Sequence, residues 1–122
     1  MTQQNKASPI VSEVIQRLAD SGIGFNASHD GPAGKVTVTL TPGQLEMFWH
    51  DPAQAFASVY GVSRGDYIAW HASGYMAQCG NLTARGRRCR NAVVDGHLVG
   101  TPDRWLAMEG GYCKVHEEGF SE

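Results

Sequence analysis

Apolar residues near the N-terminus recur at intervals of three and four positions. Because an α-helix turns once in 3.6 residues, this spacing predicts an amphipathic helix over residues 9–20. Gly22 follows as a natural stop, since glycine readily adopts the left-handed backbone that ends many helices. Farther on, apolar residues alternate with threonine over residues 35–40, which predicts a half-buried strand. With a short apolar segment at 23–25, this strand predicts a small antiparallel hairpin whose turn lies in residues 29–34.

Four of the five prolines directly follow a residue that can cap a helix. A Ser, Thr or Asp side chain accepts a hydrogen bond from an otherwise unpaired N–H, and proline at the next position lacks the N–H that would remain unpaired. Gln44 and Gln54 add the capping-box spacing after two of these caps, and Ser63 is a further candidate cap. We therefore expect a cluster of short helices after the hairpin and another near residues 102–108. The pairs are Ser8-Pro9, Thr41-Pro42, Asp51-Pro52 and Thr101-Pro102.

All three cysteines lie in the last third of the chain, and a histidine follows the last of them after two residues. Three thiolates and one imidazole complete a tetrahedral zinc shell with no open position. The spacing Cys-x9-Cys-x23-Cys-x2-His is wider at its first step than in most zinc fingers, but the intervening residues are turn-rich, so a hairpin would bring both sulfurs together. The predicted ligands of a structural zinc ion are Cys79, Cys89, Cys113 and His116.

Other interpretations of the cysteines remain open at this stage. Three buried, reduced thiols of a cytosolic protein have the same signature, and so does one disulfide with one thiol left over. His71 and His97 are possible substitute ligands. Catalytic thiol chemistry is the weakest alternative, because the chain has no Cys-x-x-Cys pair.

The two cysteine segments resemble a short zinc cassette that recurs in small, largely uncharacterised bacterial and bacteriophage proteins. The resemblance covers about 40 of the 122 residues. It rests on Cys79-Gly-Asn-Leu-Thr83-Ala-Arg-Gly86-Arg-Arg-Cys89-Arg-Asn and on Gly111-Tyr112-Cys113-Lys-Val-His116. It implies the same four metal ligands and places Thr83 and Gly86 in the turn between the first two.

Together these patterns predict an α+β protein. It would have an N-terminal helix, a small antiparallel β-hairpin, a cluster of short helices and a C-terminal zinc-stabilised module. Residues 1–76 would form the α+β domain, and residues 77–122 the Cys3His zinc module, packed on the first as one unit. Within the module, residues 93–99 are a candidate strand or second hairpin with Asp95-Gly96 as its turn.

The net charge of -2 conceals an uneven distribution. Residues 79–92 contain four arginines and no Asp or Glu, whereas residues 93–122 contain two cationic residues and six acidic ones. Guanidinium groups bind phosphates in a bidentate manner, but they also dock on acidic protein surfaces or simply solvate a loop. The candidate residues for binding a partner or phosphate, here called the arginine loop, are Arg85, Arg87, Arg88 and Arg90.

Two other functional patterns are weaker. Residues 54–70 resemble a helix-turn-helix, with Gly61 in the turn, but residues 51–74 hold one arginine and two aspartates, too few cations for a DNA reader. A metal-dependent nuclease would need an open coordination position or further ligands. Candidates for such ligands are Asp95, His97, Asp103 and Glu109.

We therefore expect a non-catalytic binding protein rather than an enzyme. Size, mild acidity and the resemblance suggest a phage or mobile-element protein that binds and inhibits a bacterial complex, as anti-defence or anti-CRISPR proteins do. The alternative is a nucleic-acid-binding protein that uses the arginine loop or residues 54–70. The first six residues lack the apolar core of a signal peptide, and no apolar run is long enough to cross a bilayer, so we expect a cytoplasmic protein of a bacterial or infected host cell.

Overall fold

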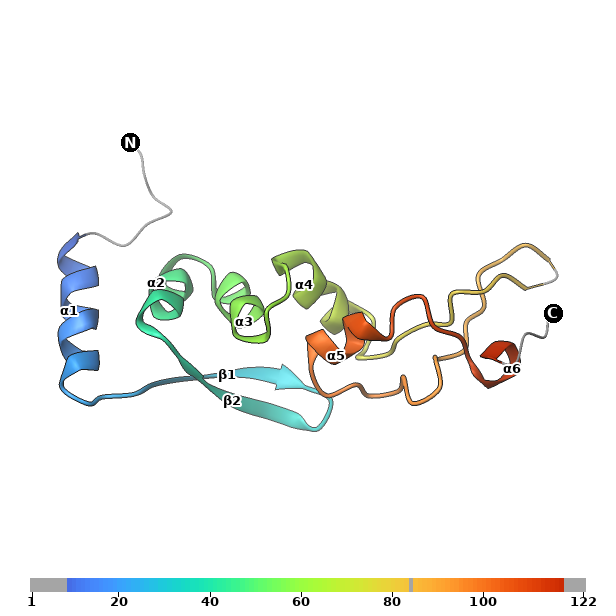
Figure 1. Ribbon diagram of the computed structural model, residues 1–122, viewed down its shortest axis with the longest axis horizontal. Helices are drawn as coiled ribbons and strands as arrows, with labels where there is room; N and C mark the ends of the chain where they lie inside the picture. Colours follow the sequence, from blue (N-terminus) through green and yellow to red (C-terminus); the bar gives the residue numbers. More distant parts are fainter. Residues whose placement is uncertain (1–8, 84, 118–122) are drawn as a thin grey trace. The chain divides into compact units, whose positions relative to one another are not determined.

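The computed structural model describes residues 9–83 and 85–117 and confirms a mixed α+β fold (Figure 1). The described residues form two compact units. The first contains residues 9–30 and 34–67, and the second contains 31–33 and 68–117. Helices α1 to α3 and most of a two-stranded sheet belong to the first unit, and α4 begins in the first and continues in the second.

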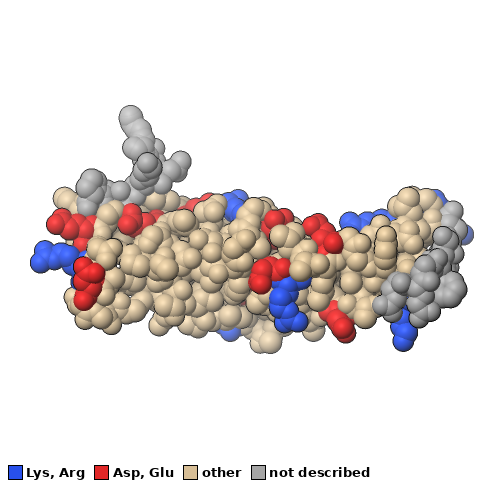
Figure 2. All heavy atoms as spheres, in the orientation of Figure 1, with Lys and Arg blue, Asp and Glu red and all other residues tan. Residues whose placement is uncertain are grey.

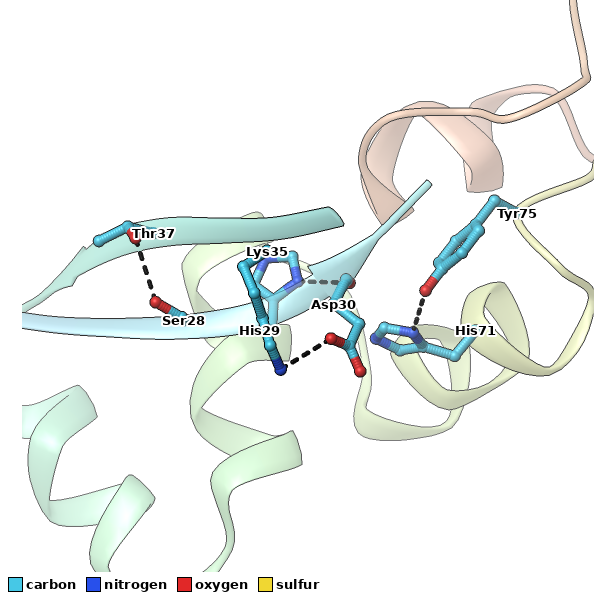
Figure 3. Close-up of polar contacts among 7 residues, drawn as sticks. All are labelled: Ser28, His29, Asp30, Lys35, Thr37, His71 and Tyr75. Atoms are coloured by element: carbon cyan, nitrogen blue, oxygen red, sulfur yellow. Dashed lines mark hydrogen bonds and ion pairs between the residues drawn. The ribbon is translucent and has the colours of Figure 1, made fainter. Parts of the chain in front are cut away.

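The first unit opens with α1 (Pro9–Asp20), followed by β1 (Phe25–Gly31) and β2 (Gly34–Leu40), which pair antiparallel. The bounds of α1 are as predicted. Strand β1 extends into the predicted turn, because cross-strand pairs continue to its end. The register is visible in three outward-facing pairs: Thr39 donates to Asn26, the Ser28 and Thr37 hydroxyls lie 3.1 Å apart, and Lys35 pairs with Asp30 at 2.8 Å (the last two in Figure 3).

The inner face of the hairpin carries a buried histidine. The carbonyl of Asp30 can only accept, so the Nδ1–H of His29 donates to it, at 2.9 Å. Nε2 lies 2.6 Å from the Tyr60 hydroxyl, from which the neutral ring would accept. The imidazole also makes edge contacts with the rings of Phe56 and Tyr67, so it belongs to the aromatic core of this unit.

Helices α2 (Pro42–His50), α3 (Pro52–Tyr60) and α4 (Arg64–Ala72) form the predicted cluster. Thr41 and Gln44 form the full capping box at the start of α2. At the start of α3 the Asp51 carboxylate accepts from the Gln54 N–H, and at the start of α4 the Ser63 hydroxyl accepts from the Asp66 backbone N–H. Ser8, the cap predicted for α1, lies outside the described residues.

In the second unit, α4 leads into an irregular segment, and α5 (Pro102–Ala107) and α6 (Lys114–Glu117) follow. The Trp70 indole is fully buried and donates to the Val99 carbonyl at 2.8 Å, and the Trp105 indole donates to the Met76 carbonyl at 2.8 Å. Tyr75 contacts His71 through its hydroxyl (Figure 3). The two indoles thus connect α4 to the segment around Val99, and α5 to the segment that follows α4.

Two local predictions for the second unit are wrong. Residues 93–99 form no strand, because Asp95 and Leu98 take positive φ values of 64° and 49°, which interrupt an extended backbone. Most of their backbone bonds go to residues 75–77 and to Tyr112. Only the turn before Gly96 is present, closed by the Gly96 N–H on the Val93 carbonyl. Thr101 starts α5 without capping it through its side chain, since its buried hydroxyl finds no partner among the described residues.

No helix in residues 9–83 and 85–117 has the length and apolar character needed to span a membrane. The predicted boundary between an α+β domain of residues 1–76 and a Cys3His zinc module of residues 77–122 stays a prediction.

The turn between α3 and α4 yields a stability prediction. Gly61 has φ +70° with open space around its Cβ position, so Gly61→Ala is penalised by the backbone conformation alone. We expect a loss of about 1 kcal/mol in the free energy of unfolding, measured by urea denaturation. Gly65→Ala is the matched control, because Gly65 lies in α4 without a positive φ; its stability should be unchanged or higher. Equal losses for both variants would contradict this explanation.

Candidate metal centre

An irregular hairpin over residues 78–92 brings the first two cysteines together. It is held by isolated antiparallel bridges between Gln78 and Ala92 and between Leu82 and Arg88. The N–H of Cys79 donates to the carbonyl of Asn91, and the N–H of Cys89 donates to the carbonyl of Asn81, both at 2.8 Å. Positions 79, 81, 89 and 91 therefore share one face of the hairpin, since side chains alternate along a strand. This register explains how nine intervening residues still place both sulfurs side by side.

The tip of this hairpin is a tight turn. The Gly86 N–H donates to the Thr83 carbonyl at 2.9 Å, and the Thr83 N–H donates to the Arg87 carbonyl. Gly86 has φ +78°, a conformation that glycine adopts without strain. Thr83 and Gly86 thus lie in the turn, as expected from the cassette.

The other two ligands come from the start of α6. The His116 N–H donates to the Cys113 carbonyl at 3.0 Å, so a single helical turn places the thiol and the imidazole on one side. Backbone contacts bring this turn to the hairpin: the Gly80 N–H donates to the Gly111 carbonyl at 2.9 Å. A Cβ on Gly111 would lie 3.0 Å from the Met108 carbonyl oxygen and 3.1 Å from a methyl group of Val93, which is a tight contact that glycine avoids.

The four side chains converge in the buried interior of the second unit. Their ligand atoms all lie within 4.8 Å of one another. Nδ1 of His116 is 3.3 Å from the sulfurs of both Cys79 and Cys113, and the sulfurs of Cys89 and Cys113 are 3.9 Å apart. All three cysteines are free thiols. Four buried residues are thus positioned to hold a metal ion.

Three of these separations are close to the edges of a zinc tetrahedron. With zinc–sulfur bonds of about 2.3 Å and a zinc–nitrogen bond of about 2.0 Å, two sulfurs lie about 3.8 Å apart and a sulfur and the nitrogen about 3.5 Å apart. The sulfur–sulfur separation here is 3.9 Å, and the two sulfur–nitrogen separations are 3.3 Å. Because Nδ1 faces the sulfurs, the neutral imidazole of a metal-bound His116 would carry its proton on Nε2.

Each sulfur accepts a hydrogen bond from the backbone two residues farther along the chain. The donor to Cys79 is the N–H of Asn81, at 3.5 Å, and the donor to Cys89 is the N–H of Asn91. For Cys113 the corresponding donor is the N–H of Val115. Such donors favour the thiolate form, which is the form that binds metals.

The pKa values of the four groups reflect this environment. Burial raises the pKa of Cys113, but the Asn91 side-chain amide and the backbone N–H groups of His116 and Val115 outweigh it and lower the pKa to about 6. Burial also raises the pKa of Cys79, and backbone donors with the His116 ring lower it overall.

The pKa values of Cys89 and His116 are raised instead. The Asn91 N–H lowers the pKa of Cys89, but burial and the two neighbouring sulfurs prevail and raise it. The hydrogen bond to Cys79 raises the pKa of His116 against the effect of burial. The lowered pKa values of Cys79 and Cys113 favour their thiolate forms. The raised pKa values of Cys89 and His116 favour their protonated forms. A divalent cation would replace those retained protons, so metal affinity should rise with pH.

The arginine loop borders the metal centre. A hollow of about 640 Å³ is lined by all four of its arginines together with Thr83, Cys89, Asn91, Val115 and His116. Figure 2 shows Lys and Arg side chains on the visible face over this segment. No described Asp or Glu forms an ion pair with these arginines. Arg88 also has an internal role, since its guanidinium donates to the carbonyls of Cys79 and Gln78 at 3.1 and 3.2 Å.

Several alternative residues lie outside this cluster. The four ligand positions are taken by three cysteines and His116, while His71 hydrogen-bonds to Tyr75 and His97 is exposed. Asp95, Asp103 and Glu109 belong to no metal-binding group among the described residues. In the helix-turn-helix-like segment, Arg64 is engaged by Asp51 at 2.7 Å, which leaves that segment with no unpaired Lys or Arg.

The sequence interpretation missed two residues that support the ligands. The Asn91 amide donates to the Cys113 sulfur at 3.6 Å, and the Gln78 amide donates to the Cys89 carbonyl at 2.8 Å. A signal for the first was present: Cys79-Gly-Asn81 and Cys89-Arg-Asn91 repeat the same Cys-x-Asn step. The hairpin register places each cysteine opposite the asparagine of the other step.

A comparison of the chain with known protein families, curated proteins and solved structures found no match.

The Asn91 contact predicts a measurable effect on metal affinity. Asn91→Ala removes a donor to the Cys113 sulfur and should weaken zinc binding about tenfold in a competition titration with a chromophoric chelator. Asn81→Ala is the matched control: its donor to Cys79 is the backbone N–H, which alanine retains, so affinity should stay close to that of the parent. Equal weakening by both substitutions would show that the side-chain contact has no special role.

Proposed function

We propose that this protein is a non-catalytic binding protein whose C-terminal unit is stabilised by a structural zinc ion. The observation that carries this proposal is the set of three buried sulfurs and one imidazole nitrogen within 4.8 Å of one another. Three thiolates and one nitrogen are a donor set that suits zinc, and four protein ligands leave no position for a reacting water. A metal-dependent nuclease would need such a position.

Cobalt substitution tests the structural role. Protein reconstituted with Co²⁺ should show the intense visible absorption of a tetrahedral, sulfur-rich site, and added azide or cyanide should leave the spectrum unchanged because no coordination position is open. Cys113→Ser is the control that should alter the charge-transfer bands. A spectrum that shifts with the added anion would contradict the closed shell and favour catalysis.

The partner is the finer part of the proposal. The cassette resemblance, the small size and the mildly acidic composition support a phage or mobile-element protein that inhibits a bacterial complex, of the anti-defence or anti-CRISPR kind. The arginine loop would dock on an acidic protein surface of that complex, because its four arginines line one hollow and concentrate positive charge there.

A plating assay tests this role. Bacteria whose CRISPR–Cas complex targets a phage should regain sensitivity to that phage when they express the parent protein, and a variant with Arg85, Arg87 and Arg90 changed to alanine should fail to restore it. Arg104→Ala removes an arginine outside the loop, and this control should act like the parent. Unchanged plating across strains with different CRISPR–Cas types would contradict the anti-CRISPR form of the proposal.

Nucleic-acid binding is the second candidate. It is favoured by the hollow that all four arginines line, since guanidinium groups around a concave surface suit phosphate oxygens. The helix-turn-helix-like segment contributes little to this candidate, because its one arginine is paired with Asp51.

Fluorescence anisotropy with labelled DNA and RNA at low salt tests the second candidate. The parent should bind, and log K should fall with log salt by about one unit of slope per phosphate contact. Arg87→Ala should weaken binding and reduce that slope, whereas Arg104→Ala should not. Undetectable binding of the parent to every oligonucleotide at low salt would exclude this function and leave the protein-partner proposal in place.

A further inference from the structure

Helix α1 has an apolar face that is wider than the part its own unit covers. One row of the face, around the buried Ile15, is directed at α2, where Ser12 donates to Glu46 at 2.7 Å. A second row lies about a quarter turn away and is solvent-exposed. Ile10 is 72% exposed, Val14 50% and Leu18 38%.

The exposed row continues beyond the end of the helix. The Ile23 N–H donates to the Leu18 carbonyl at 3.2 Å, and Gly22 takes φ +96°, so the chain turns back at the helix end. Ile23 is 51% exposed and follows Leu18 in the row. Single exposed apolar residues need no explanation, but four in one line on a helix and its cap form a patch of the kind that mediates association.

One edge of this row carries a pair of opposite charges. Glu13 and Arg17 lie one turn apart on the side of the row that faces away from Ile15. Neither forms an ion pair with another described residue. Figure 2 shows acidic and basic side chains next to each other over α1.

We propose that this row, Ile10, Val14, Leu18 and Ile23, is the interface of a homodimer in which two α1 helices pack antiparallel about a two-fold axis near Val14. In that arrangement Ile10 of one copy meets Leu18 of the other, and Val14 meets its own equivalent. The same edges of the two helices face each other, so Glu13 of each copy faces Arg17 of the other, with an offset of about 3 Å along the axis that an arginine side chain spans.

Charge complementarity is what selects a second copy as the occupant. The row is self-complementary in the antiparallel sense, because that two-fold axis brings the same edges of the two helices together and places Glu13 of each copy next to Arg17 of the other. The eight residues before α1 contain six polar or charged side chains and so match an apolar face poorly. A single helix face is small for an interface, so the dimer should be weak and depend on protein concentration.

Sedimentation equilibrium on the full chain with one equivalent of zinc tests the interface. The average mass should rise with concentration from 13.2 kDa towards twice that value. Val14→Glu should hold the protein monomeric over the same range, while Leu82→Glu, at an exposed leucine outside α1, should leave the association unchanged. Far-ultraviolet circular dichroism shows whether each variant keeps its helices.

A charge-swap cycle tests the antiparallel pairing. Glu13→Arg and Arg17→Glu should each weaken dimerisation about tenfold, since each juxtaposes like charges, and the double variant should restore it. If the parent protein remains monomeric at the highest attainable concentration, the proposal is overturned, and the exposed row would have to bind a different partner. A dimer that Val14→Glu does not affect, or a double swap no better than the single ones, would overturn it as well.

Discussion

The convergence of three thiol sulfurs and one imidazole nitrogen is the constraint on which the C-terminal unit depends. Its described residues contain little regular structure: part of α4, two short helices and two isolated bridges. The ligands come from both sides of the hairpin and from α6, and Cys79 and His116 are 37 positions apart. A cation at this point would cross-link three segments at once, and the gain grows with the length of chain that it closes.

The supporting hydrogen bonds show that the backbone is arranged for thiolates. An N–H two residues beyond each cysteine points at its sulfur, and two of these donors belong to the repeated Cys-x-Asn step. Because three thiolates with Zn²⁺ would carry a formal charge of -1, the arginine loop beside them would offset the charge of the centre. Arg88 links the loop to the hairpin, since it binds the hairpin backbone and also lines the hollow.

Local signals explain why much of the fold could be predicted. The bounds of α1 and the caps at Thr41, Asp51 and Ser63 depend on residues within one turn of each other, so the sequence displays them directly. The prediction of a strand over residues 93–99 is wrong because their apolar pattern does not reveal the left-handed backbone at Asp95 and Leu98, which contacts with distant segments stabilise. The same limit applies at the centre: the ligand types were visible, but the register that places Asn91 on the ligand face is a long-range property.

Zinc-edge X-ray absorption of protein purified without added metal tests the central claim most directly. The predicted shell holds three sulfurs at about 2.3 Å and one nitrogen at about 2.0 Å, with one zinc ion per chain. A chain that carries no metal, or a shell in which water or carboxylate oxygen replaces one of the sulfurs, would contradict a closed structural site formed by Cys79, Cys89, Cys113 and His116.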